Sequence, residues 1–282
     1  MMYATQFPDS APRMGDMKNP VQLLQKLVAY RSWVEDQLGE PLSLSESTQT
    51  VAAQLEELFV SRPLNIVSDD FISTFISKAN NLVFEGTQGV LLDEWVGFHP
   101  HTTWSTVTPQ NALRALQEAG RSDDPRVLGI VRSYATRHGY GPFPTELLSE
   151  SDTARFSEHH NKHGRWQGAW RVGDFDMSLM RYAISAAQKV DGIVLSHCDT
   201  PAANIVDYGD VAVAPIPILS IEEEQLAKQY VNTQRLLSVD TTVAHRTSIE
   251  STEQLTSMIE SETDVPVVMT SYGPTSDDRN WL

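Results

Sequence analysis

Two helix-to-strand units give this chain its clearest fold signal. Residues 177–189 have the apolar spacing of an amphipathic helix, and a short apolar run at 192–195 follows them directly. The same order returns near the C-terminus, where a helical pattern at 251–262 precedes a strand pattern at 265–270. Helices that alternate with strands are typical of an α/β domain whose ligand loops follow the strand ends. We therefore predict an α/β fold, with a mixed or parallel sheet and flanking helices.

Other segments carry weaker patterns. The spacing of apolar residues predicts helices over residues 21–37, 51–60, 69–76, 124–135 and 222–230. Short apolar or alternating runs predict strands over 81–85 and 211–219, and 139–144 form a Gly/Pro-rich loop. We expect one domain over residues 1–282, with a mainly helical part over 1–80 and the sheet with its ligand loops over 81–282.

Composition excludes some classes of protein. The chain has 21 Lys and Arg against 37 Asp and Glu, a formal net charge of -16. This acidic balance argues against binding to DNA or RNA, whose phosphates need a basic surface. A small nucleotide needs only a few local cations and backbone N–H groups, so a nucleotide pocket stays open.

The chain carries no sign of a secreted or membrane protein. Cys198 is its one cysteine, so a disulfide framework within the chain is excluded and a reducing compartment fits. No run of about 18 apolar residues would span a membrane, and the first residues lack a signal-peptide pattern. We expect a cytoplasmic protein with no membrane partner.

The first segment that could carry chemistry is Phe-Glu-Gly-Thr-Gln-Gly-Val-Leu-Leu-Asp at 84–93. It sets Gln88 in a turn between Gly86 and Gly89, and glycines let a ligand approach the backbone closely. The glutamine amide both donates and accepts hydrogen bonds, which suits a nucleobase or ribose edge. An ordinary strand and turn with an exposed amide explains the same pattern.

Two further segments combine polar groups with a rigid backbone. The hydroxyl-rich stretch 99–106 includes Thr103 and either binds a phosphate or forms a polar loop. His99 and His101 in that stretch have no acidic or cysteine partner at a metal-ligand spacing. Residues 136–147 place Arg137 before a Gly/Pro loop, which shapes a pocket wall or simply turns the chain.

The most cationic stretch of this acidic protein covers residues 159–171. Arg165 and Arg171 flank glycines there, and guanidinium groups pair bidentately with carboxylate or phosphate. The histidines of this stretch suggest metal binding less strongly than they suggest a polar loop.

Polar residues also follow the two predicted C-terminal strands. Asp199 comes at the end of the strand pattern 192–195, and a carboxylate there can accept hydrogen bonds from the N–H edge of a purine. A helix cap or a turn would equally use an aspartate. Ser271 and Gly273 follow the last strand in the same way.

Some familiar motifs are absent from these 282 residues. Neither Gly-x-x-x-x-Gly-Lys-Ser/Thr nor Gly-x-Gly-x-x-Gly occurs, so no recognisable triphosphate-binding loop is present. A Gly-x-Ser-x-Gly nucleophile turn is absent too.

In this order, the segments resemble the adenylosuccinate synthetase family. Family members typically show Phe-Glu-Gly-Ala-Gln-Gly-x-Leu-Leu-Asp, Thr-Arg-x-Gly-x-Gly-Pro-Phe-Pro-Thr-Glu-Leu, Thr-Lys-x-Asp and Ser-Thr-Gly-Pro. The counterparts here lie at 84–93, 136–147, 196–199 and 271–274. The match through Gly-Pro-Phe-Pro-Thr-Glu-Leu at 141–147 is long and specific. The resemblance extends from about Arg13 to the C-terminus.

The resemblance implies a fold, a reaction and partners. The fold would be adenylosuccinate synthetase-like, related to P-loop NTPases. The γ-phosphate of GTP moves to O6 of IMP with the help of Mg²⁺, and L-aspartate then displaces phosphate from C6. The expected partners are a purine nucleoside monophosphate, GTP or ATP, L-aspartate and a second copy in a homodimer, with no nucleic acid.

The same resemblance assigns roles to residues one by one. Gln88 matches a catalytic, nucleotide-binding glutamine that helps the 6-oxyanion to form, and Thr103 falls where a threonine binds the IMP phosphate. Asp199 matches the carboxylate that recognises guanine. The full nucleotide-binding set is Thr87, Gln88, Gly89, Thr103, Gly168, Arg171, Asp199, Ser271 and Gly273, and the aspartate-binding set is Gln167, Gly168 and Arg171.

Several family features are missing. We find neither the Gly-Asp-Glu-Gly-Lys-Gly phosphate loop nor the Asn-Ala-Gly-His-Thr segment with its catalytic histidine, so the N-terminal phosphate-loop portion is expected to be lacking. No Mg²⁺ ligand is expected in this chain. The aspartate loop has Trp-Gln-Gly-Ala at 166–169 in place of Thr-Thr-Gly-Arg, and His197 replaces a lysine. These changes favour the phage branch, which makes 2-aminoadenylosuccinate from dGMP and aspartate with ATP.

Three hypotheses follow. The first is a purine-nucleotide ligase represented by an incomplete chain, with little or no ligase activity alone. The second is a non-catalytic nucleotide-binding remnant, or a subunit that needs a separate N-terminal half. The third and weakest is a metalloprotein built on the histidine loop.

Overall fold

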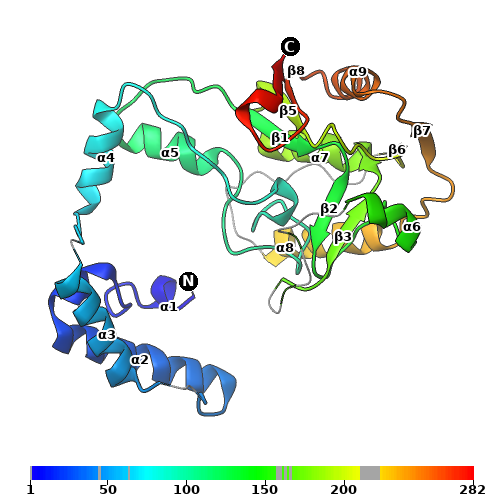
Figure 1. Ribbon diagram of the computed structural model, residues 1–282. Helices are drawn as coiled ribbons and strands as arrows, with labels where there is room; N and C mark the ends of the chain where they lie inside the picture. The colour runs from blue at the N-terminus through cyan, green and yellow to red at the C-terminus, as the bar shows by residue number, and fades with distance from the viewer. Residues whose placement is uncertain are drawn as a thin grey trace. The chain divides into compact units, whose positions relative to one another are not determined.

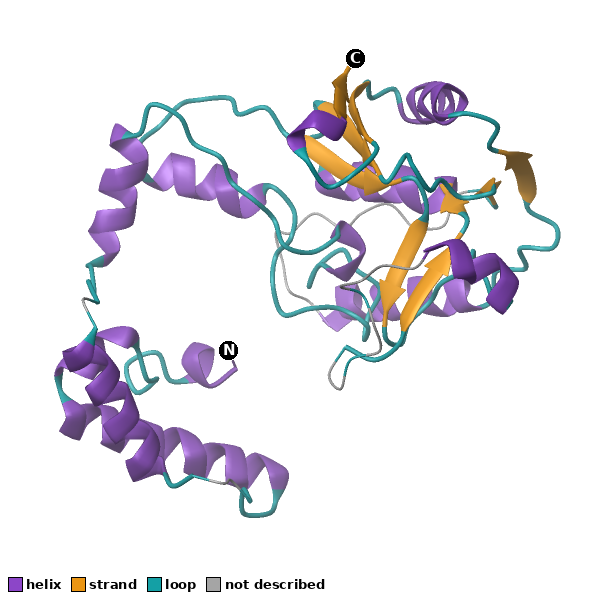
Figure 2. Cartoon of the chain, in the orientation of Figure 1, coloured by secondary structure: helices purple, strands orange, loops and turns teal. Residues whose placement is uncertain are grey.

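The computed structural model describes residues 2–43, 46–62, 64–156, 161, 164, 167–209 and 223–282. The chain divides into two compact units, Met1–Lys78 and Ala79–Leu282 (Figures 1 and 2). Within the described part of the chain, no helix is both long enough and apolar enough to cross a membrane.

The first unit is helical. It contains α1 (Met2–Gln6), the 3₁₀ helix η1 (Met14–Lys18), α2 (Pro20–Leu38), α3 (Thr48–Ser61) and α4 (Asp69–Lys78). The Asn19 side chain accepts the Gln22 N–H to cap α2, and Gly39 ends that helix with a φ of 71°. Ser47 caps α3 in the same way. The helices predicted over 21–37, 51–60 and 69–76 are confirmed.

A four-stranded mixed sheet forms the centre of the second unit. Its strands are β1 (Leu128–Arg132), β5 (Gly192–Ser196), β8 (Val267–Ser271) and β9 (Arg279–Trp281), in the spatial order β1-β5-β8-β9. The first three are parallel and β9 is antiparallel to β8. The predicted α/β class with a mixed sheet is thereby confirmed.

Two smaller sheets and several helices complete this unit. The antiparallel pair β2 (Ala135–His138) and β3 (Trp170–Gly173) forms one sheet. The other sheet contains β4 (Phe175–Asp176), β6 (Asn204–Asp207) and β7 (His245–Ser248). The helices are η2 (Val90–Leu92), α5 (Gln110–Glu118), α6 (Glu150–Thr153), η3 (Ala154–Phe156), α7 (Met177–Ala187), α8 (Glu223–Leu237), α9 (Thr252–Thr263) and η4 (Ser276–Asp278).

Helices α7 and α9 contact each other and bury one face of the sheet (Figure 1). Leu195 in β5 and Leu255 and Ile259 in α9 are fully buried, and they belong to one apolar cluster with Met177 of α7. Burying each such side chain contributes about 1.5–3 kcal/mol. This packing confirms the helix-to-strand units that the sequence predicts at 177–195 and 251–270.

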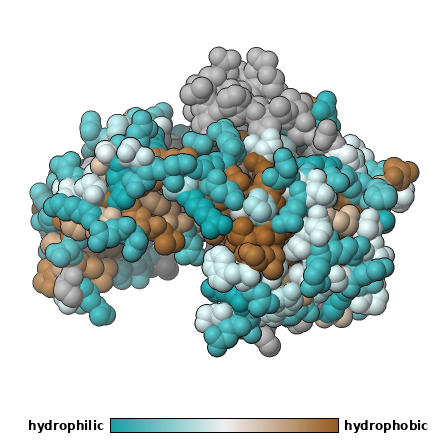
Figure 3. All heavy atoms as spheres, turned by 90° about the horizontal axis from the view of Figure 1, so that it is seen from above, coloured by the Kyte–Doolittle hydropathy of each residue, from teal (hydrophilic) through white to brown (hydrophobic). Residues whose placement is uncertain are grey.

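The opposite face of the sheet is partly open. Ile130, Val194, Met269 and Trp281 stand in register across the four strands, so their side chains share a face. The two edge residues stay exposed, at 77% for Ile130 and 69% for Trp281. Figure 3 shows apolar atoms exposed at several places on the surface of the chain seen from above. Both edges of the sheet therefore retain uncovered apolar surface.

Two predicted elements are wrong. Residues 124–135 were expected to form a helix, but they contain β1 and the start of β2, because β1 takes its hydrogen bonds from β5 and its β-branched residues suit a pleated sheet. Residues 81–85 were expected to form a buried strand, but they form a loop in which Val83 is 93% exposed. The strand predicted over 211–219 lies outside the described residues.

Asp176 holds the start of α7 in place. Its carboxylate accepts the Leu179 N–H at 2.8 Å and the Tyr208 hydroxyl at 2.9 Å. Burial is the main cause that raises the pKa of Asp176 from 3.8 to about 7. The folded state therefore binds this proton more tightly than the unfolded state, and the stability that Asp176 contributes falls as pH rises from about 4 to about 7.

We predict that Asp176→Asn becomes progressively less destabilising, relative to the native protein, as pH rises. Asparagine can still cap α7 but carries no charge to bury. The difference in unfolding free energy should shift in favour of the variant by about 2 kcal/mol between pH 5 and pH 8. Chemical denaturation at both pH values measures it, with the exposed Asp277→Asn as control. A difference that does not change with pH would contradict the raised pKa.

Candidate functional site

The carboxyl ends of β1, β5 and β8 meet at one edge of the sheet. Ser133, directly after β1, donates its N–H to Ser196 O at 2.9 Å and its hydroxyl to His197 O at 2.6 Å. Cys198 in turn donates its N–H to Ser271 O at 2.9 Å. The loops that follow the three strands are thus tied together, which brings the segments of Asp199 and Ser271 to the same place.

The polar groups at this edge differ in whether they are exposed or already bonded within the protein. The Asp199 carboxylate is exposed, and its one described side-chain contact is with the Thr200 hydroxyl at 3.4 Å. Ser271 donates its hydroxyl to Gly273 O at 3.0 Å. A Cβ at Gly273 would lie 2.6 Å from an Asp278 carboxylate oxygen, so a larger residue there would require the Asp278 side chain to move. The edge therefore offers one exposed carboxylate, with a single long hydrogen bond, beside a turn that Ser271 closes.

Cys198 is not suited to nucleophilic chemistry at this edge. Its thiol is buried, and burial raises the pKa from 9.0 to about 11. The preceding His197 has a φ of 59°, an uncommon conformation for a residue with a side chain. Its ring packs edge-on against Tyr134, with 5.6 Å between the ring centroids.

A second group of polar residues lies on the β2–β3 ribbon, where Arg137 stands directly opposite Arg171. Arg171 donates from Nε to Glu146 Oε1 at 2.8 Å and from Nη2 to Glu146 Oε2. Its Nη1 donates to Gly139 O and Gly141 O, both at 3.0 Å. Every nitrogen of Arg171 therefore has a protein acceptor, and its charge is balanced by Glu146.

Arg137 is bonded differently. Its Nε and Nη2 donate to Tyr140 O at 3.0 and 2.8 Å, and Nη2 also donates to His101 O at 3.3 Å. Burial, and then the neighbouring Arg171, lower the pKa of Arg137 from 12.5 to about 10, so it stays charged at neutral pH. Burial and these two arginines also lower the pKa of His101, which keeps that ring neutral.

Glycines bring two backbone segments together beside this arginine pair. Gly139 has a φ of 67°, and a Cβ there would lie 2.8 Å from Gln167 O. Gly168 has a φ of 75°, and its Cβ would lie 3.0 Å from the Gly139 Cα. Gln167, Gly168 and Arg171, the predicted aspartate-binding set, are therefore neighbours around one tight turn.

The predicted nucleotide segment 87–103 is built around a buried carboxylate. Asp93 is fully buried and accepts the N–H groups of Trp95, Val96 and Val107 at 2.7, 3.1 and 2.6 Å. Leu92 donates its N–H to Gly89 O at 2.9 Å and accepts the Thr103 N–H at 2.7 Å. These bonds hold the glycine turn and the hydroxyl segment against each other, while the Thr87 and Gln88 side chains stay exposed.

Hydrogen bonds connect some of the predicted site residues and leave others apart. Arg137 bridges to His101 O, two residues before Thr103, and so joins the segment 87–103 to the arginine pair. Asp199, Ser271 and Gly273 form the other group, at the sheet edge. Among the described residues no hydrogen bond or ion pair joins Gln88 directly to Asp199. Between the two groups in sequence, the Arg132 guanidinium lies 5.4 Å from the Trp170 ring centroid and 5.7 Å from that of Tyr134.

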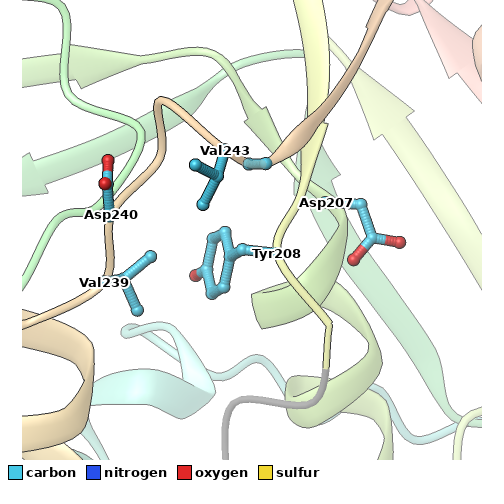
Figure 4. Close-up of a pocket in the computed structure, with 6 residues that line it drawn as sticks. Asp207, Tyr208, Val239, Asp240 and Val243 are labelled. Carbon is cyan, nitrogen blue, oxygen red and sulfur yellow. The ribbon is translucent and has the colours of Figure 1, made fainter.

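A cavity of about 370 Å³ lies elsewhere and contains none of the predicted site residues (Figure 4). It is lined by Asp207, Tyr208, Val239, Asp240, Val243 and Ala244. Arg181 forms a bidentate pair with Asp207, at 2.7 and 2.9 Å, and is the main cause that lowers the pKa of this carboxyl. Asp240 accepts from the Thr242 N–H and hydroxyl at 2.9 and 2.6 Å. Both carboxylates in the lining are thus occupied by protein donors.

The histidines that the structure describes give no support for a metal centre. Over the part of the chain that the structure describes, no three of His, Cys, Asp and Glu gather in a way that could hold a metal ion. The ring of His99 bonds to Glu94 O at 2.7 Å instead. His159, His160, His163 and Arg165 lie outside the described residues.

Sequence reasoning did not include Arg137, His101 and Glu146 among the site residues. Arg137 and Glu146 flank the Gly/Pro loop, and charged residues on both sides of a rigid loop are a signal that could have found them. Which acid pairs with which arginine could not be read from the sequence, because Glu146 and Arg171 are 25 positions apart.

Comparisons with known proteins agree on one family, adenylosuccinate synthetase. The family model for adenylosuccinate synthetase matches residues 1–280. The adenylosuccinate synthetase of Hahella chejuensis is 32% identical over 197 residues, which cover 66% of this chain and 43% of that protein. The chain spans less than half the length of the curated relatives that it matches.

Two solved structures share features with this chain. The fully ligated adenylosuccinate synthetase of Plasmodium falciparum has a TM-score of 0.69 at 19% identity, covering 99% of this chain and 68% of that one. The succinoaminodeoxyadenylate synthetase of cyanophage S-2L, solved with dGMP and dATP, has a TM-score of 0.47 at 17% identity, covering 92% and 61%. The first value supports the same fold, and the second is too low to favour one substrate branch over another.

We predict that Asp93→Asn destabilises the second unit by about 3 kcal/mol, because the amide can no longer accept all three buried N–H groups. Urea denaturation followed by tryptophan fluorescence measures the change. Asp264→Asn is the matched control, since Asp264 is exposed and has a φ of 59°, which asparagine also accepts. Equal stability of the two variants would show that Asp93 does not organise this segment.

Proposed function

Because the chain belongs to the adenylosuccinate synthetase family, we propose that it carries the nucleotide- and aspartate-binding loops of a ligase that joins L-aspartate to C6 of a purine nucleotide. The acceptor is IMP or dGMP, and the phosphate donor is GTP or ATP. We further propose that the active form is a homodimer acting in purine nucleotide synthesis.

This proposal is supported by two groups of loops that bring polar side chains and backbone N–H groups together. The segment 87–103 and the turns at Gly139 and Gly168 keep backbone close to an arginine pair, and the sheet edge adds the free Asp199 carboxylate. Loops at the carboxyl ends of parallel strands are the usual place for a nucleotide in α/β proteins. A purine nucleotide needs cationic and N–H groups for its phosphate and amide or carboxylate groups for its base, and this set supplies both.

We propose a separate role for each group of site residues. The Gln88 amide contacts the purine edge at the 6-position, where charge develops on oxygen, and is the catalytic residue of this chain. Thr87, Gly89 and Thr103 hold the acceptor nucleotide. Asp199, with Ser271 and Gly273, recognises the base of the triphosphate. Gln167 and Gly168 hold L-aspartate. The resemblance assigns Arg171 to aspartate and nucleotide as well, but because every nitrogen of its guanidinium is bonded to the protein, we propose that it shapes the turn beside them.

The chemistry needs C6 to lose its oxygen. Transfer of phosphate to that oxygen converts it into a good leaving group, and the aspartate amine then forms the new C–N bond while phosphate departs. Members of the family use Mg²⁺ for the phosphoryl step. The described residues of this chain contain no cluster of carboxylate, histidine or cysteine ligands that could hold it.

We predict that the purified chain binds a purine monophosphate but shows little or no turnover alone, since no phosphate-loop motif occurs in its 282 residues. Thermal unfolding with IMP, dGMP, GTP or ATP identifies the nucleotides that bind, because a ligand stabilises the state to which it binds. Gln88→Ala should lose most of the shift given by the monophosphate, whereas Gln117→Ala, an exposed glutamine on α5, should keep it.

The outcomes separate the hypotheses. No stabilisation by any of the four nucleotides would refute the proposed function. Binding without phosphate release in a coupled assay fits either a non-catalytic binding protein or a chain that needs a further polypeptide. Robust turnover by these 282 residues would refute the expected inactivity.

A further inference from the structure

Arg137 carries a hydrogen-bonding group that the protein leaves unused. Its Nε and Nη2 both donate to Tyr140 O, and Nη2 also donates to His101 O. Within the described residues Nη1 has no acceptor, so two N–H groups of a half-buried guanidinium are open. Nη1 is not among the buried atoms that lack a partner, so it reaches solvent and stays accessible to a ligand.

The charge around Arg137 is also uncompensated. Among the residues that the structure describes, its hydrogen-bond acceptors are backbone carbonyls, whereas the neighbouring Arg171 is neutralised by Glu146. The register of β2 and β3 sets the two guanidinium groups on the same face of the ribbon. Because the pKa of His101 is lowered, this ring adds no charge at neutral pH. The two arginines and the Glu146 carboxylate therefore sum to one positive charge at a partly buried site. Such a charge is costly to bury unless an anion pairs with it.

The surrounding backbone keeps this guanidinium in one position. Gly141 has a φ of 126°, and a Cβ there would collide with the Arg137 guanidinium. Arg171 Nη1 binds Gly141 O and Gly139 O, so the pair with Glu146 fixes the turn against which Arg137 lies. Arg171 thus holds the loop, and the Arg137 guanidinium lies against Gly141 of that loop and against His101 O.

We propose that Arg137, through Nη1, is the residue that binds the substrate oxyanion at this site, and that Arg171 is a positioning residue for the loop. The ligand group is an oxyanion with two accessible oxygens, supplied either by the phosphate of the purine monophosphate or by a carboxylate of L-aspartate. This assignment rests on the proposed function for the identity of the substrate. The presence of the anion site itself rests on the contacts of Arg137.

The test is Arg137→Gln in the full chain, studied by isothermal titration calorimetry and thermal unfolding. The probes are inorganic phosphate, succinate, L-aspartate, IMP, dGMP and the uncharged nucleosides inosine and deoxyguanosine. Losing a hydrogen bond to a charged group should weaken anion binding about 10- to 100-fold. Arg114→Gln is the matched control, because it removes one positive charge from exposed helix α5 and should leave every affinity unchanged.

The pattern across probes identifies the source of the oxyanion. Weaker binding of phosphate and of IMP or dGMP, with the nucleosides unaffected, assigns Arg137 to the nucleotide phosphate. Weaker binding of succinate and L-aspartate, with nucleotides unaffected, assigns it to the amino acid. If Arg137→Gln leaves every anion affinity unchanged, or weakens nucleosides as much as anions, the proposal is wrong.

A second variant and a comparison of ligands on the native chain make the result interpretable. Arg137→Lys retains the charge but loses the planar fork, so it should bind anions about tenfold less tightly with an unfolding temperature near that of the native chain. It replaces Arg137→Gln if the latter does not fold, and unchanged anion affinity in it would equally overturn the proposal. If the native chain binds inorganic phosphate or succinate through Arg137 but binds no nucleotide, the anion site stands and the proposed function fails.

Discussion

The bidentate pair between Arg171 and Glu146 is the interaction on which the candidate site depends. It joins strand β3 to the end of the Gly/Pro loop, and the same guanidinium binds the carbonyls of Gly139 and Gly141. The two side chains are only 20% and 24% exposed, so the pair is partly shielded from water and salt. Removing one partner would leave the other charge without compensation, which costs more than an exposed pair contributes.

A second constraint comes from the sheet. Parallel strands β1, β5 and β8 end at one edge, and hydrogen bonds from Ser133 and Cys198 fix the loops beyond them. Because β2 follows β1 after two residues, the arginine ribbon is attached to the same edge. A buried core of α7, α9 and the strands supports this edge, so the loops can keep irregular backbone and exposed polar groups without losing the fold.

Much of the fold could be predicted because its signals are local. Helix α7 followed by β5, and α9 followed by β8, carry their periodicity and buried runs within short windows. The strand β1 could not be distinguished from a helix, since its apolar run is short and only pairing with β5, about 60 residues later, selects the extended form. Strands β6 and β7 are partly polar and are likewise defined by pairing with distant segments.

The site residues also divide into features set by local sequence and features set by distant partners. Motifs placed Gln88, Gly168 and Asp199 on loops, but the bonding of each charge depends on partners far away in sequence. The contacts show that Arg171 pairs with Glu146, which no motif indicates, and that Arg137 has one nitrogen, Nη1, without a described acceptor.

The most direct measurement is a crystal structure of the chain with the bound monophosphate and L-aspartate. We predict a substrate oxyanion about 2.7–2.9 Å from Arg137 Nη1, in a cleft that also includes Gln88. A ligand held by Arg171, or seated in the cavity beside Tyr208, would contradict it.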